Sequence, residues 1–239
     1  RDRSPSRGLG DVYKRQYYDD VAATFTNFAM SGIDKVHFGL EAAVSIPIYH
    51  TLALNGAVSW GQYTYDSNPY YLQTQDNSGD IVSDGYVYWK DFRVESTPQT
   101  AVNVGLSWRS NNNIYLSADF NYYNNMYLSM SPIYRTDAVI TGGMAPGDIE
   151  HLRRQEKFDS AYTLNASIGK NWYIHRKYTL GFSLDVKNIL NNQDIKTGGY
   201  EQTRLSKNTE TTVTTYQAFD SKYFYMFGTT YYLNLYFRF

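Results

Sequence analysis

The segment VHFGLEAAVSIPI, residues 36–48, alternates strictly between two kinds of side chain. Its even-numbered positions are all apolar, whereas its odd-numbered positions include His37, Glu41 and Ser45. Successive side chains of a β-strand point to opposite faces, so a period of two residues predicts a strand that separates two different surroundings. A segment of this length also suits a tilted strand that crosses a bilayer.

Six further segments repeat this design, and together they predict an all-β antiparallel fold. In every segment one face is free of charged residues, as lipid requires, because Arg or Lys at the bilayer midplane costs roughly 2–4 kcal/mol. The opposite faces carry Glu41, Asp119, Asp185 and Arg238, which we expect to point into the lumen of a transmembrane β-barrel. The six segments are residues 52–60, 100–108, 114–122, 162–168, 178–186 and 231–239.

A soluble β-sandwich also has alternating strands, but two features favour a membrane barrel over it. The runs are long, and the chain is rich in the aromatic residues that mark membrane–water interfaces, with 25 Tyr and 17% aromatic residues overall. No apolar run approaches the roughly 18 residues that a transmembrane helix needs. Aromatic residues stand at the expected strand ends, namely Trp60, Tyr63, Tyr65, Trp108, Tyr122, Tyr123, Trp172 and Tyr173.

The links between the seven segments alternate between short and long. Outer-membrane barrels have short periplasmic turns and long extracellular loops, so we expect every long link on the outer side. An eighth strand is expected within residues 17–30. The short links are 49–51, 110–113 and 173–176, and the long links are 66–98, 128–157 and 191–221.

Composition and spacing exclude several kinds of site. The chain has no Cys, which excludes disulfide scaffolds and thiolate metal sites, and its net charge of −1 with no basic stripe disfavours nucleic-acid binding. The four His residues match no metal or Ser–His–Asp spacing. Within residues 76–80 oxygen side chains stand at alternate positions, as in calcium loops, but Ile81 and Val87 stand where an EF-hand needs Gly and an acid. We therefore expect no metal, no cofactor and no enzymatic activity.

The C-terminal sequence YYLNLYFRF, residues 231–239, ends in an aromatic residue after alternating apolar positions. It resembles the C-terminal signal of outer-membrane barrels, carried here by Tyr231, Leu233, Leu235, Phe237 and Phe239. The string LDVKNILNNQDI at 184–195 is similar to the V-x-N-L-F-N motif before the last loop of TonB-dependent receptors, with Ile189 and Leu190 in place of Leu and Phe.

Three more strings resemble the Bacteroidetes branch of that family. They are GGYEQTRL at 198–205, with the ending GTTYYLNLYFRF, and IDKVHFGLEAAVSI at 33–46, which matches a recurrent G-x-E strand at Gly39 and Glu41. The resemblance implies the C-terminal part of a barrel of about 22 strands, in the cell outer membrane, that encloses an N-terminal plug. It also implies outer-membrane lipid, the barrel-assembly machinery and TonB as partners, the last through an N-terminal part outside this chain.

Such receptors import scarce nutrients, and the resemblance leaves open an iron chelate, cobalamin, a glycan or a peptide. An alternative is a small complete eight-stranded barrel with an adhesion or structural role. An outer-membrane enzyme such as a lipase would need a Ser–His pair at the lipid rim, and none is apparent. Residues 1–16, which are basic and lack periodicity, are expected to be a non-native leader, with the barrel segment spanning 17–239.

The long links are rich in aromatic residues that suit two roles. Tyr and Trp offer large contact areas with one polar group, so they are candidates for ligand capture at the barrel mouth. The same residues serve loop packing and the outer aromatic girdle. The ligand-binding candidates are Tyr70, Tyr71, Tyr86, Tyr88, Trp89, Tyr134 and Tyr200.

Overall fold

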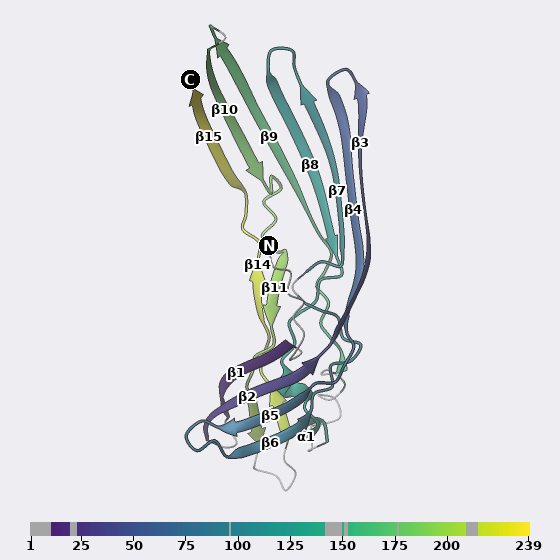
Figure 1. Cartoon of the computed structure of the whole chain (residues 1–239), viewed down its shortest axis with the longest axis vertical. Helices are drawn as coiled ribbons and strands as arrows, with labels where there is room; N and C mark the ends of the chain where they lie inside the picture. Colours follow the sequence, from purple (N-terminus) through teal and green to yellow (C-terminus); the bar gives the residue numbers. More distant parts are fainter. Residues whose placement is uncertain are drawn as a thin grey trace, which may run out of the picture.

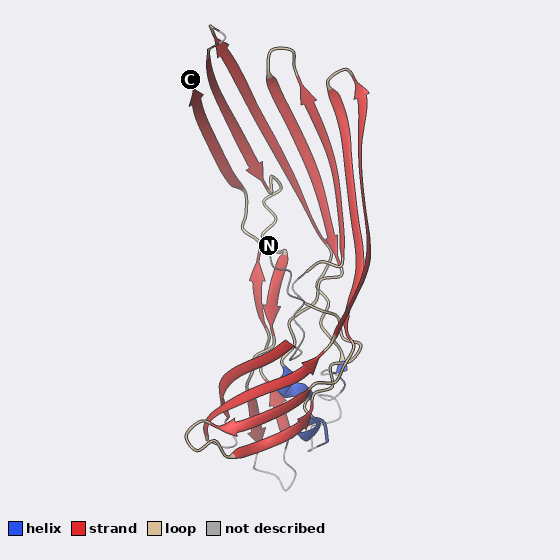
Figure 2. Cartoon of the chain, in the orientation of Figure 1, coloured by secondary structure: helices blue, strands red, loops and turns tan. Residues whose placement is uncertain are grey.

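The computed structural model describes residues 11–19, 23–95, 97–141, 150, 153–175, 177–208 and 215–239. These ranges consist mainly of antiparallel β-strands with a few short helical turns (Figure 2), which confirms the predicted all-β antiparallel class. A long sheet, called the wall, occupies one end of the molecule, and smaller sheets and loops occupy the other (Figure 1). None of the described helices has the length and apolar character needed to cross a membrane.

The wall contains the seven strands that the alternating segments predict. They lie in the order β15-β10-β9-β8-β7-β4-β3, so each strand is paired with its neighbour in the predicted series. Among the described residues β3 and β15 form two open edges, and the wall is a curved open sheet (Figure 1). The strands are β3 (Lys35–Tyr49), β4 (Leu52–Tyr65), β7 (Thr100–Arg109), β8 (Ile114–Asn124), β9 (Ala161–Ile174), β10 (Tyr178–Lys187) and β15 (Thr230–Arg238).

One face of the wall is a hydrogen-bonded polar surface. The strand register places polar residues opposite one another, and their side chains bond across the strands. The hydroxyls of Ser117 and Ser167 are 2.7 Å apart, and Asn103 Nδ2 donates to Asn121 Oδ1 at 2.8 Å. A similar chain runs from Ser45 through Asn55 to Ser107. The polar residues of different strands therefore form a continuous surface.

The other face is apolar and uncovered by any described residue. Leu40 is 67% exposed, Leu106 46% and Leu235 70%, although such side chains are normally buried in soluble proteins. Because the register aligns apolar residues across all seven strands, the face is continuous from edge to edge. Other exposed members are Val36, Phe38, Val44, Ile46, Val58, Trp60, Val104, Leu116, Phe120, Tyr162, Ile168, Trp172, Leu180, Leu233 and Phe237.

The short turns lie at one end of the wall and the long links at the other (Figure 1). Each of the three turns contains a residue with positive φ, namely His50, Asn113 or His175. At the opposite end Asn188, which follows β10, is buried and bonds the carbonyls of Asn192 and Phe227 through Nδ2 at 2.9 and 3.0 Å. The side chain of Asn188 thereby joins the end of β10 to the approach to β15.

The long links fold together with the N-terminal strands into a structure that we call the cap, formed by the described residues of 11–33, 66–98, 128–157 and 191–229. Its main sheet has the order β1-β2-β5-β6, and two small hairpins pair β11 with β14 and β12 with β13. The elements are β1 (Asp11–Asp19), β2 (Thr24–Ile33), β5 (Tyr70–Gln75), β6 (Ile81–Tyr86), η1 (Pro132–Arg135), α1 (Asp137–Thr141), β11 (Lys196–Tyr200), β12 (Leu205–Asn208), β13 (Thr215–Ala218) and β14 (Lys222–Tyr225).

The described core lies in the cap, together with Tyr65 at the adjoining end of β4, and not beneath the wall. It is formed by Phe28, Met30, Ile33, Tyr65, Tyr71, Val87, Trp89, Met130 and Ile133. Residues 24–33 alternate, but Thr26 lies on the buried face and Phe25 on the exposed face, so the hydrophobic pattern is blurred. The prediction of a barrel strand within residues 17–30 is therefore corrected, because β2 pairs with β1 and β5 and not with the wall.

The number of strands also exceeds the seven or eight expected, because the long links contain strands of their own. Part of the segment expected to be a leader also belongs to a strand, since residues 11–16 form the first part of β1 and pair with β2. Residues 1–10 lie outside the described residues.

Candidate functional site

Three of the predicted ligand-binding aromatics are buried and hold the cap together. Tyr71 stacks on Phe28 with ring centroids 5.1 Å apart, and Trp89 packs against Tyr65 at 4.7 Å. Tyr134 donates its hydroxyl hydrogen to the Arg204 carbonyl at 2.8 Å. Burial raises the pKa of the Tyr71 and Tyr134 phenols. These three rings therefore pack the loops against one another, which is the second of the two roles that the sequence suggests for the aromatic residues.

The other four predicted aromatics are at the surface, in three separate places. Tyr70 and Tyr86 meet edge to face across β5 and β6 with centroids 5.7 Å apart, and the Tyr70 hydroxyl bonds Asp84. Tyr200, in β11, lies beside Phe224 and lines a cavity of about 270 Å³. Tyr88 lines a larger cavity of about 680 Å³. The seven candidates thus do not converge on one site.

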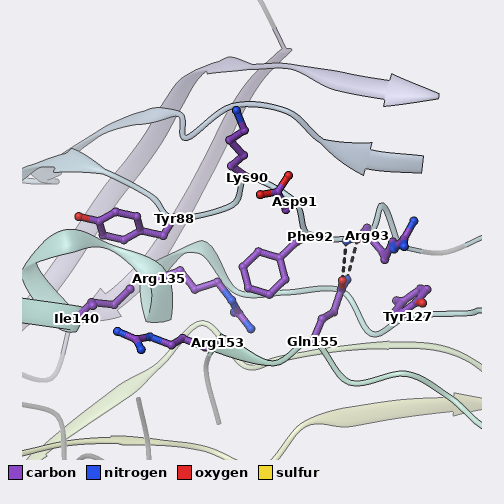
Figure 3. A pocket seen from close by; sticks show the side chains of 10 residues that line it. All are labelled: Tyr88, Lys90, Asp91, Phe92, Arg93, Tyr127, Arg135, Ile140, Arg153 and Gln155. Carbon is purple, nitrogen blue, oxygen red and sulfur yellow. Dashed lines mark hydrogen bonds between the residues drawn. The ribbon is translucent and has the colours of Figure 1, made fainter. Parts of the chain in front are cut away.

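The larger cavity is the candidate site that the geometry supports best. It lies between residues 88–93 of one long link and described residues at the start and within the next one, from 127–141 and 153–155 (Figure 3). Its volume is within the range of about 300–1,000 Å³ that is usual for small-molecule sites. It is lined by Tyr88, Lys90, Asp91, Phe92, Arg93, Tyr127, Arg135, Ile140, Arg153 and Gln155.

Gln155 fixes one side of this cavity. Its Oε1 accepts a hydrogen bond from the Arg93 backbone N–H at 2.8 Å, and its Nε2 donates to the Arg93 carbonyl at 2.7 Å (Figure 3). The same Nε2 lies 3.3 Å from the Leu128 carbonyl. The carbonyl of the preceding residue, Phe92, accepts a hydrogen bond from the Tyr65 N–H at 2.9 Å, which joins the segment to the end of β4. One side of the cavity is therefore joined to the wall by a backbone hydrogen bond.

Arg135 and Glu201 form a buried ion pair behind the cavity. Arg135 Nη1 and Nη2 lie 2.5 and 2.8 Å from the two carboxylate oxygens of Glu201, and the two side chains are only 1% and 11% exposed. The guanidinium also lies 5.2 Å from the centre of the Phe92 ring. Arg135 Nε is buried and has no partner in the described part of the chain. Arg135 is the last residue of η1, and Glu201 directly follows β11. The ion pair therefore connects two of the long links.

The residues predicted to face the lumen share the polar face of the wall. Glu41 accepts from Ser59 at 3.4 Å, Asp119 lies opposite Gly105, and Asp185 lies opposite Ser167. The guanidinium of Arg238 lies 5.3 Å from the Tyr236 ring. These groups are spread over the wall and form no cluster. Within the described ranges no three His, Asp or Glu residues are grouped as metal ligands would be.

The residues of the C-terminal signal all lie at the free edge, in β15 or directly after it. Tyr231 is 72% exposed and Phe239 94%, and Leu233, Leu235 and Phe237 are exposed on the same face. They extend the apolar face of the wall to its last strand.

Sequence reasoning did not find the cations of the cavity. Lys90, Arg93 and Arg153 stand in long links with no regular spacing, and only folding brings them together. The one available signal was the basic character of short stretches such as 153–154. Comparisons of the chain with protein-family models, with curated proteins and with solved structures found no match.

Proposed function

We propose that this chain forms wall strands and the outer cap of a TonB-dependent outer-membrane receptor that imports a scarce nutrient. In this proposal the apolar face of the wall contacts lipid, the polar face lines the lumen, and the cap lies outside the cell. Strands outside this chain continue the sheet from the free edges of β3 and β15, and a plug outside this chain contacts TonB.

The observation that carries the proposal is the apolar face of the wall. Exposed apolar patches on soluble monomers rarely exceed a few hundred Å², and a larger one indicates a membrane or protein partner. Here the exposed apolar side chains extend across seven strands, with the polar groups gathered on the opposite face. Lipid suits this surface because no charged residue interrupts its middle rows.

The cap supports the import role. All three long links lie at the end of the wall opposite the short turns (Figure 1), as expected for extracellular loops of an outer-membrane barrel. A folded cap with cavities at this position suits the capture of a dilute ligand before its passage inward. The assignment to the TonB-dependent, Bacteroidetes-type family is supported by the sequence motifs at 33–46, 184–205 and 228–239.

The alternative, a complete eight-stranded barrel with an adhesion or structural role, has less support. That barrel needs a strand from residues 17–30 between β3 and β15, and β2 pairs instead with β5 in the cap. The titratable groups of the polar face are dispersed along the described wall strands, so this face offers no cluster that would support an enzymatic role.

The test is expression of the natural gene product in a Gram-negative host with and without TonB. Outer-membrane fractionation and the heat-dependent gel shift of folded barrels report insertion, and uptake of labelled nutrients reports transport. The proposal expects an inserted barrel and uptake that is lost without TonB. A protein that stays out of the membrane contradicts the barrel assignment, and uptake that does not need TonB contradicts the family assignment.

A further inference from the structure

The cavity between residues 88–93 and the described residues of 127–155 has an unusual balance of charge. Four cations, Lys90, Arg93, Arg135 and Arg153, line it, together with the single carboxylate of Asp91. Glu201 neutralises Arg135 from behind the cavity. Even so, the remaining lining has three cations against one anion. The cavity is therefore positive although the whole chain has a net charge of −1.

The three remaining cations have no anionic partner among the described residues. Arg135 pairs with Glu201, Arg154 with Glu150 and Lys196 with Glu156, and none of these pairs involves Lys90, Arg93 or Arg153. Figure 3 shows Lys90 and Arg93 on one side of the Phe92 ring, with their charged ends directed away from it, and Arg153 on the other side. Like charges around one concavity raise the local positive potential, which favours an anion from solution.

The remaining lining restricts what that anion is. Phe92, Tyr127, Tyr88 and Ile140 give the cavity apolar and aromatic walls, which suit a carbon skeleton. Guanidinium groups present planar forks of N–H donors that match carboxylate and phosphate oxygens. Gln155 fixes the backbone of Arg93 at both its N–H and its carbonyl, so the point from which this side chain leaves the cavity wall is set before any ligand binds.

We infer that this cavity binds a small ligand with two or more anionic oxygen groups, carboxylate or phosphate, on an organic skeleton. Arg93, Arg153 and Lys90 hold the anionic groups, and Phe92 with its aromatic neighbours contacts the skeleton. The inference rests on the proposed function only in placing the cavity on the outer side of the membrane. It narrows the open list of nutrients to anionic ones and disfavours neutral glycans.

The test uses the full-length protein folded in detergent and isothermal titration calorimetry with three probes: citrate, pyrophosphate and the neutral sugar raffinose. Binding of citrate or pyrophosphate that weakens with added salt is expected, and raffinose should not bind. A preference for citrate identifies carboxylate as the recognised group, and a preference for pyrophosphate identifies phosphate. If neither anion binds the folded protein, or raffinose binds better, the inference is overturned.

Neighbouring arginines provide a matched pair of variants. Arg153 lines the cavity, whereas Arg154 does not and instead pairs with Glu150, with its side chain 78% exposed. Both changes to Gln remove one positive charge at almost the same place. Arg153→Gln should weaken anion binding roughly tenfold or more, as expected for loss of a hydrogen bond to a charged group. Arg154→Gln should change it by no more than about twofold, as for an exposed ion pair. Equal losses would show only a general effect of net charge and would overturn the site.

Insertion is measured on the same preparations by the heat-dependent gel shift, so that the two proposals fail separately. An inserted protein that binds neither anion refutes the anionic ligand and leaves the receptor assignment standing. A protein that binds citrate or pyrophosphate but does not insert refutes the membrane assignment alone. Circular dichroism of both arginine variants confirms that an altered affinity does not come from unfolding.

Discussion

Leu184 and Asp185 are consecutive residues of β10 that belong to opposite faces of the wall. Leu184 is aligned with Ile168 on β9 and Leu233 on β15, whereas Asp185 is aligned with Ser167 and Tyr232 on the same two strands. Side chains that are adjacent in sequence therefore lie in two separate rows, one apolar and one polar. If the apolar row faces lipid, the two residues should respond very differently to substitution.

We predict that Leu184→Arg destabilises the membrane-inserted protein by roughly 2–4 kcal/mol, the cost of Arg at a lipid-facing midplane position. Asp185→Asn should have a much smaller effect, because in the proposed receptor its side chain faces water or the plug. Urea unfolding in lipid vesicles measures both changes. Equal destabilisation by the two variants would mean that the faces are assigned wrongly.

The glycines of the two faces should also differ in tolerance. At Gly169, on the polar face, an added Cβ would occupy the space of the Tyr115 ring, which lies over the glycine from the neighbouring strand. At Gly56, on the apolar face, it would meet only Val44 Cγ1 at 3.5 Å. Gly169→Ala should therefore cost about 1–3 kcal/mol through overpacking. Gly56→Ala should be neutral or slightly stabilising, and the reverse order in urea unfolding would contradict this packing.

The strands of the wall could be predicted from sequence because each one separates two surroundings. Residues 36–48 and 178–186, for example, alternate without interruption, and that alternation depends only on the strand itself and not on distant contacts. The short turns could be predicted by the same reasoning, because each lies between two alternating segments, as the turns at His50 and His175 do.

The cap could not be predicted in the same way, because its core is assembled from residues far apart in the chain. Tyr71 is buried against Phe28 on another strand, and the carboxylate of Glu201 is buried against Arg135. No local pattern distinguishes the buried Trp89 from the exposed Tyr88 beside it. For the same reason, the sequence predicted aromatic residues in the long links but not the cavity that combines Arg93 with Arg153.

Loss of the buried carboxylate of Glu201 should loosen the cap and leave the wall intact. Removing one partner of a buried ion pair costs roughly 3–5 kcal/mol, so Glu201→Ala should lower the local stability of η1 by about that amount. Glu150→Ala is the control, because its pair with Arg154 is exposed on both sides. Hydrogen exchange of residues 131–136 measures the change. Similar exchange in the two variants, or loss of protection in the wall, would contradict the prediction.

Alkaline pH should weaken the cap at Tyr223. Burial, with a hydrogen bond from its hydroxyl to Glu156 Oε2 at 2.8 Å, raises the pKa of Tyr223 from 10.0 to about 12. A raised pKa means that the folded state favours the protonated phenol. This stabilising contribution is complete below pH 10 and is lost as the pH rises through 12. Local stability of β14 by hydrogen exchange should fall across that window, and Tyr223→Phe should remove this part of the fall. An unchanged pH dependence in the variant would contradict the assignment.

The most direct test of the account is the environment of single side chains along β10 in the membrane. Because the chain has no Cys, one Cys at a time can be introduced at residues 182–186 and spin-labelled with no competing thiol in this chain. The account predicts that labels at 182, 184 and 186 collide with lipid-soluble oxygen, and that labels at 183 and 185 collide with a water-soluble nickel chelate or are shielded from both. Oxygen collisions without a period of two, or nickel access at 184, would contradict the claim that the apolar face of the wall contacts lipid.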